Sequence, residues 1–159
     1  MTKQKVYLET TLFNFYLDTD RGDAHVDTVR LFKEIAAGQY EAYSSDYVVD
    51  ELKRAPTEKR EKMLALFTEY EIKVLETADE AERLADIYIS ARIIPQKHRT
   101  DALHIALATV SGLDIIVSMN FQHIVKQKTA KMTGAINVLN GYRVMEIASP
   151  MEVIDDGYV

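Results

Sequence analysis

The feature that most limits the fold is a repeated alternation between short β-prone runs and longer helix-like stretches. The short runs are KVYL (5–8), EAYSS (41–45), IKVL (72–75), DIIVS (114–118) and YRVMEI (142–147). Parallel strands must be joined by crossover connections of a dozen or more residues, and these are usually helices. The alternation therefore predicts an α/β protein with a mostly parallel sheet of four or five short strands.

Capping and helix-ending residues divide the stretches between these strands. We expect helices at 25–37, 58–70, 79–91 and 121–133, and two more that are N-capped by Asp46 and Thr100. Gly38 and Gly112 are suited to end two of the helices, because glycine readily adopts the left-handed conformation of a C-terminal cap.

Length and composition narrow the class of protein. A chain of 159 residues favours one domain, residues 1–159, and the absence of Cys excludes disulfides and Cys-ligated metals. The net charge of −6 argues against a broadly basic nucleic-acid binder but permits acids gathered around a cation. We expect a soluble, cytoplasmic protein, since we see neither a signal peptide nor an apolar run approaching the ~20 residues of a membrane span.

Four polar residues are expected at one edge of the sheet. Ligands of open α/β sheets bind outside the carboxyl ends of the strands. Glu9 directly follows the first strand, and Asn120 follows DIIVS. Asp101 opens a helix, and Glu51 lies on the apolar side of the helix after the second strand. Their shared placement suggests a single site.

Each of these residues also has a plain structural explanation. Glu9 would be an exposed acid at a strand end, and Glu51 would pair with a basic residue at the edge of the core. Asp101 would favour the dipole of its helix, and Asn120 would serve a turn. His104, three residues after Asp101, would be a core histidine bonded to a backbone carbonyl.

The chemistry of such a set is that of hard cations. Carboxylate and amide oxygens complete an oxygen shell for Mg²⁺ or Mn²⁺. The cation lowers the pKa of water and stabilises charge on a phosphate oxygen. Carboxylates without Cys or a His-rich set argue against zinc.

Four segments of the chain resemble the motifs of PIN-domain ribonucleases, and within them VapC-like proteins, the toxin half of many toxin–antitoxin pairs. The segments are VYLETT, YVVDEL, RTDALHIALA and LDIIVSMNFQHI, which contains SMN. The resemblance covers nearly the whole chain. It implies a PIN-like three-layer α/β/α fold.

The chain departs from the family pattern at two positions. The first acid is usually Asp, and Glu9 is one methylene longer. Asn120 stands where the family usually has Asp, so less charge is neutralised there. Asp114 is not a replacement, because it precedes its strand and six residues place it roughly 20 Å from Asn120.

The resemblance implies a metal-dependent endoribonuclease in which water attacks an RNA phosphodiester in line. The catalytic and metal-holding residues would be Glu9, Glu51, Asp101 and Asn120, with one or two Mg²⁺ or Mn²⁺ ions. Thr10, Ser118 and His104 would assist, and His104 would bond a ligand carboxylate or fill the core. The resemblance also implies a small antitoxin as partner and a homodimer.

Local basic residues would have to contact RNA in a chain of net negative charge. The candidates border the expected site: Lys97, Arg99, Lys126 and Lys128. An ordinary solvated charged face explains them equally well. Phe13, Phe15 and Tyr16 offer rings for base stacking, but their helical spacing favours the core or a dimer surface.

The sequence also allows three other hypotheses about function. The first is a PIN-like protein that binds RNA or a partner without cleaving. The second is a different metal-dependent phosphoesterase, for example a phosphatase or a DNA nuclease. The third, a di-iron site suggested by the Asp-x-x-His spacing of Asp101 and His104, has little support because that spacing occurs once.

Overall fold

A five-stranded parallel sheet forms the centre of the protein. The structure, a computed structural model, describes residues 2–155. The strands are β1 (Gln4–Leu8), β2 (Tyr40–Ser45), β3 (Lys73–Leu75), β4 (Ile115–Val117) and β5 (Glu146–Ala148). Their order is β3-β2-β1-β4-β5, and every neighbouring pair is parallel. The parallel sheet predicted from the alternation is confirmed.

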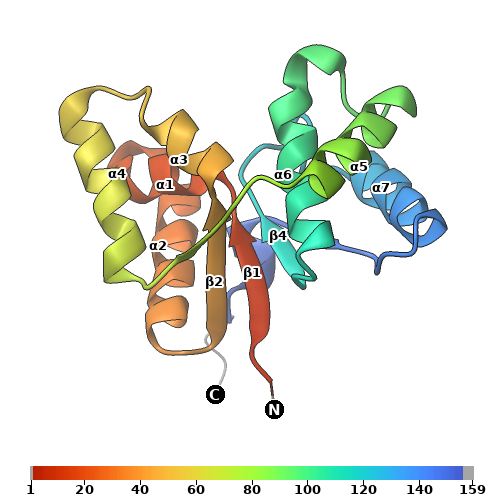
Figure 1. Ribbon diagram of the computed structural model, residues 1–159. Coiled ribbons are helices and arrows are strands. Elements are labelled where there is room, and N and C mark those ends of the chain that lie inside the picture. Colours follow the sequence, from red (N-terminus) through yellow and green to blue (C-terminus); the bar gives the residue numbers. More distant parts are fainter. Residues whose placement is uncertain (1, 156–159) are drawn as a thin grey trace.

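Helices cover both sides of this sheet. They are α1 (Thr10–Leu17), α2 (Asp23–Ala36), α3 (Asp46–Leu52), α4 (Thr57–Glu69), α5 (Asp79–Ser90), α6 (Arg99–Val110), α7 (Gln127–Leu139) and α8 (Pro150–Val153), with 3-10 turns η1 (Thr19–Arg21) and η2 (Gln96–His98). Figure 1 shows α1 to α4 gathered on one side of the central strands and α5 to α7 on the other. The result is a three-layer α/β/α architecture.

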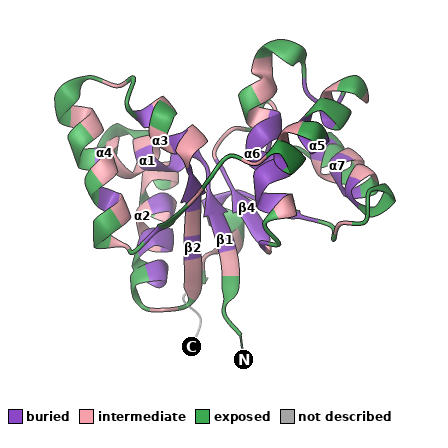
Figure 2. Ribbon diagram, viewed as in Figure 1, coloured by how far each residue is buried: buried purple, intermediate pink, exposed green. Residues whose placement is uncertain are grey.

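Helix α6 is the most deeply buried helix beside the sheet. Residues 102–109 are all buried, and Figure 2 shows this helix in the colour of the buried class beside the central strands. A helix that is apolar on all sides must be covered on all sides, and α6 packs between α5 and β4. Within residues 2–155, no helix is both long enough and apolar enough to cross a membrane.

Two expected N-caps are wrong by one or more residues. Ser45, not Asp46, caps α3, because its Oγ accepts a hydrogen bond from the Val48 amide at 3.3 Å. Helix α6 begins at Arg99, directly after η2, so Thr100 lies inside it. Gly38 and Gly112 do follow the ends of α2 and α6, with φ of +85° and +73°.

Two later elements begin further along the chain than expected. Helix α7 starts at Gln127 rather than at residue 121, because the side chain and carbonyl of Asn120 bind the amides of His123, Ile124 and Val125 in a turn. Strand β5 starts at Glu146, because the Tyr142 amide still bonds to the end of α7, at the Asn137 carbonyl, over 2.8 Å.

The strand order reverses between β1 and β4. The chain places β2 and β3 on one side of β1 and then places β4 and β5 on the other. Leu8 and Val117 pair at the carboxyl ends of β1 and β4. The connections leaving these two ends diverge, and this is where ligands bind in open α/β sheets.

Candidate active site

Glu9 lies at the carboxyl end of β1 and is almost completely buried. It caps α1, with Oε1 accepting hydrogen bonds from the Thr11 amide at 3.1 Å and the Thr11 hydroxyl at 2.5 Å. The Ser118 hydroxyl donates to the same oxygen at 2.6 Å. The side chain is 3% exposed, so Glu9 is not an exposed strand-end acid. Burial raises the pKa of this carboxyl, although His104, Ser118 and Thr11 act to lower it.

Hydrogen bonds of Ser118 and Thr11 connect the carboxyl ends of β1 and β4. The Asn120 amide donates to the Ser118 hydroxyl at 2.9 Å, and the Met119 amide donates to the Thr11 hydroxyl at 2.8 Å. Both hydroxyls donate to Glu9. The Ser-x-Asn segment after β4 is thereby fixed against the first acid.

Glu51 projects from α3 towards the same edge. Its Oε1 accepts hydrogen bonds from the Thr10 hydroxyl at 2.9 Å and from His104 Nε2 at 2.7 Å. Burial would raise the pKa of Glu51, but the hydrogen bond and the charge of His104 outweigh it, so the pKa is lowered. Glu51 is therefore a carboxylate held in its charged form.

His104 is fully buried and connects Glu51 to the core. Its Nδ1 lies 2.7 Å from the Tyr7 hydroxyl, which in turn lies 2.6 Å from the Ser45 hydroxyl. Burial would lower the pKa of His104. The hydrogen bond to Glu51 and the charges of Glu9, Glu51 and Asp101 outweigh burial and raise it. The charges of three carboxylates from three segments thus act on one imidazole.

Asp101 lies in the first turn of α6 and is half-buried. Burial raises the pKa of its carboxyl, whereas the charge of His104 and a side-chain hydrogen bond from Asn120 lower it. The Asn120 Oδ1 accepts the amide of His123 at 3.0 Å. Asn120 therefore serves a turn and also faces Asp101.

The carboxylates of Glu9 and Glu51 offer oxygen ligands to a hard divalent cation, but among residues 2–155 the ligand atoms of Glu9, Glu51 and Asp101 do not all lie within 4.8 Å of one another. Oε1 of Glu9 and Oε1 of Glu51 are fixed by protein donors, while Oε2 of each accepts no hydrogen bond from residues 2–155. Burial raises the pKa of the Glu9 and Asp101 carboxyls. A neighbouring positive charge would therefore stabilise their charged forms. The Asn120 oxygen fits less well, because it already accepts a backbone amide.

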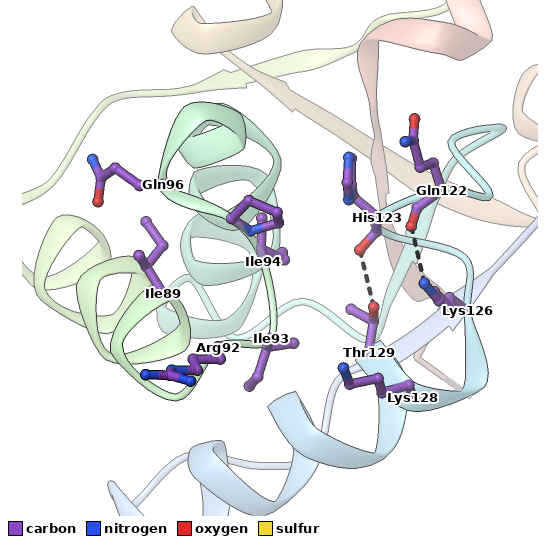
Figure 3. A pocket seen from close by; sticks show the side chains of 11 residues that line it. Ile89, Arg92, Ile93, Ile94, Gln96, Gln122, His123, Lys126, Lys128 and Thr129 are labelled. Carbon is purple, nitrogen blue, oxygen red and sulfur yellow. Dashed lines mark hydrogen bonds between the residues drawn. The ribbon is translucent and has the colours of Figure 1, made fainter.

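The basic residues expected to contact RNA have different environments. Arg99 forms an ion pair with Asp86 of α5, with Nη2 and Oδ1 3.1 Å apart. Lys97 lies exposed in η2. Lys126 and Lys128 line a pocket of about 530 Å³ next to the turn after β4, together with Arg92. Figure 3 shows Arg92, Lys126 and Lys128 around the pocket, with His123 on the same side as Lys126.

The expected base-stacking rings have other roles. Phe13 is fully buried and stacks on Phe67, with ring centroids 4.9 Å apart. The Tyr16 hydroxyl lies 2.6 Å from that of Tyr70, and the Arg21 guanidinium lies over the Phe15 ring. Phe13 is a core residue, as its spacing favours.

Sequence reasoning missed four residues close to this site. Tyr7 and Ser45 complete the hydrogen-bond chain of His104. His98 and His123 offer ligand atoms that lie within 4.8 Å of one another and of Asp101. A signal for Tyr7 was present, since a buried tyrosine hydroxyl needs a partner.

A solved structure has the same fold. No protein-family model and no curated protein matches the chain. The chain is similar to one chain of the crystal structure of VapBC2 from Rickettsia felis bound to a DNA fragment from their promoter. The TM-score is 0.58 at 13% identity, over 92% of this chain and 98% of that chain. At this identity the likeness concerns the fold, and the expected PIN-like three-layer architecture is confirmed.

Proposed function

We propose that the protein is a Mg²⁺- or Mn²⁺-dependent endoribonuclease. The observation that carries the proposal is the arrangement of Glu9, Glu51 and Asp101 around the buried His104, where the strand order of the sheet reverses. Burial raises the pKa values of Glu9 and Asp101, so their charged forms are costly in a resting protein unless a cation offsets them. The fold resembles that of a nuclease family, which agrees with this reading.

Glu9, Glu51 and Asp101 would hold one or two ions, with Asn120 assisting. A bound cation would stabilise the negative charge on the scissile phosphate and lower the pKa of the attacking water. The protein contributes fixed oxygens, because Thr11 and Ser118 hold Glu9 while Thr10 and His104 hold Glu51.

His104 would be a positioning residue. It is fully buried, and its two nitrogens are engaged by Glu51 and Tyr7. The Tyr7 hydroxyl on Nδ1 fixes the orientation of the His104 ring. Hydrogen-bond partners orient the histidines of metal sites in the same way. The ring in turn fixes Glu51 in its charged form.

RNA phosphates would lie along Lys126, Lys128 and Lys97. Lys126 and Lys128 line the same pocket as Gln122, which lies two residues after Asn120. Arg99 contributes less, because Asp86 already neutralises its charge.

We also propose that the protein acts with a protein partner, either a second copy or a small antitoxin. An exposed apolar face over α7 supports this: Val138, Leu139 and Val144 are 59%, 81% and 60% exposed. Light scattering of wild type, Leu139→Glu and the control Met151→Glu tests the homodimer. A dimer lost only in Leu139→Glu supports it. A cytoplasmic location stays a prediction.

The direct test of the function is hydrolysis of a mixed pool of structured and single-stranded RNA. The pool is incubated with Mn²⁺ or Mg²⁺, with and without a chelator, beside matched DNA and a phosphomonoester. Metal-dependent cutting of RNA alone supports the proposal. Turnover of DNA or the monoester instead identifies another phosphoesterase, and RNA binding without cutting identifies a binding protein.

A further inference from the structure

Three side chains from separate segments converge beside the acidic site. His98 ends η2, Asp101 lies in the first turn of α6, and His123 lies in the turn after β4. One ligand atom from each lies within 4.8 Å of the other two. The His98 and His123 ring centroids are 4.1 Å apart. Two imidazoles and a carboxylate at this separation form a donor set for a metal ion.

One of these donors lacks any other partner. His123 Nε2 is buried and has no hydrogen-bond partner among residues 2–155. A buried nitrogen without a partner is costly, and native proteins usually satisfy such atoms with water or an ion. A cation bound to the lone pair of this nitrogen would satisfy it.

The backbone around His123 is already fixed. The His123 amide donates a hydrogen bond to the Asn120 side chain at 3.0 Å. The His123 carbonyl accepts a hydrogen bond from the Thr129 hydroxyl at 3.0 Å, which Figure 3 shows as a dashed line. On the other side, the Arg99–Asp86 ion pair anchors the residue that joins His98 to α6. The backbone that carries His123 is therefore held in place before an ion arrives.

We propose that His98, Asp101 and His123 bind a borderline divalent transition-metal ion, with Zn²⁺ as its representative. Imidazole suits Zn²⁺ and its neighbours in the first transition row, whereas Mg²⁺ prefers oxygen alone. Three protein ligands leave a fourth position open, as in catalytic zinc sites. The site shares Asp101 with the carboxylate cluster but stands independently of the proposed nuclease activity.

The test is direct metal binding by the full chain after removal of metals with a chelator. Zn²⁺ binding is followed by calorimetry, and Co²⁺ binding by visible absorption. We expect one site, with affinity reduced roughly tenfold or more in His98→Gln and in His123→Gln. The matched control is His25→Gln, whose ring bonds the Phe15 carbonyl in another part of the fold. It should bind as wild type.

A rescue variant separates ligand loss from misfolding. The chain has no Cys, so His98→Cys introduces a single thiol. A thiolate is also a zinc ligand, and we expect Co²⁺ binding to persist with a new sulfur-to-metal charge-transfer band. Absence of Zn²⁺ binding by folded wild type, or binding unchanged in both Gln variants, overturns the proposal. Neither outcome depends on RNA cleavage.

Discussion

His104 Nε2 lies 2.7 Å from Glu51 Oε1, and this bond joins a fully buried imidazole of α6 to a carboxylate of α3. The two helices lie more than forty residues apart in sequence, and the bond fixes the second acid of the candidate site against the core. It also links the stability of the fold to the charge state of the site.

Tyr7→Phe should weaken both the fold and the site. The substitution removes the hydroxyl between Ser45 and His104, which leaves a buried ring nitrogen unpaired. We expect a loss of about 1–3 kcal/mol of unfolding free energy, measured by urea denaturation, together with weaker Mn²⁺ binding. Tyr16→Phe is the control: it removes one hydroxyl, whose partner is the Tyr70 hydroxyl and none of the candidate site residues, so Mn²⁺ affinity should stay unchanged.

Glu9→Gln should raise the melting temperature of the metal-free protein. Burial raises the pKa of Glu9, so its charge opposes folding at neutral pH, and a neutral amide oxygen still accepts the bonds from Thr11 and Ser118. Each kcal/mol gained corresponds to about 2–4 °C for a chain of this size. With Mn²⁺ present the order should reverse. A lower melting temperature in chelator would contradict this reading of Glu9.

The stability of the metal-free protein should fall as pH rises above the ordinary histidine pKa of about 6.5 because of His104. Its pKa is raised in the folded state, so the contribution is complete below the ordinary value of about 6.5 and is lost as pH rises through the folded pKa. Denaturation curves in chelator across this range measure the effect. His104→Gln should flatten the dependence, and an equally steep dependence in that variant would assign it to another group.

Arg92→Gly should stabilise the fold and weaken RNA binding. Arg92 follows α5 with φ of +61°, where a side chain costs about 1–2 kcal/mol that glycine avoids. Arg92→Ala should therefore be less stable than Arg92→Gly by about 1 kcal/mol, since it keeps the backbone strain. Both variants lose the same charge from the pocket of Lys126 and Lys128, so filter binding should show equal losses of RNA affinity.

The sheet was predictable because its strands are short apolar runs separated by helix-length stretches, and the chain order then requires parallel pairing. The edge that holds Glu9 was predictable for the same reason. The start of α7 was not, because the Asn120 side chain diverts residues 121–125 into a turn. Neither was the convergence of His98 and His123, because it depends on how η2 packs beside that turn.

Cleavage of RNA by Asp101→Asn, compared with wild type and with Asp50→Asn in Mn²⁺, tests the central claim most directly. Asp50 is an exposed acid next to Glu51 and controls for the loss of one charge. We predict that Asp101→Asn stays folded by circular dichroism and loses roughly 100-fold or more of the cleavage rate, while Asp50→Asn cleaves as wild type. Cleavage that survives in folded Asp101→Asn would contradict the assignment of these carboxylates as the metal-holding site.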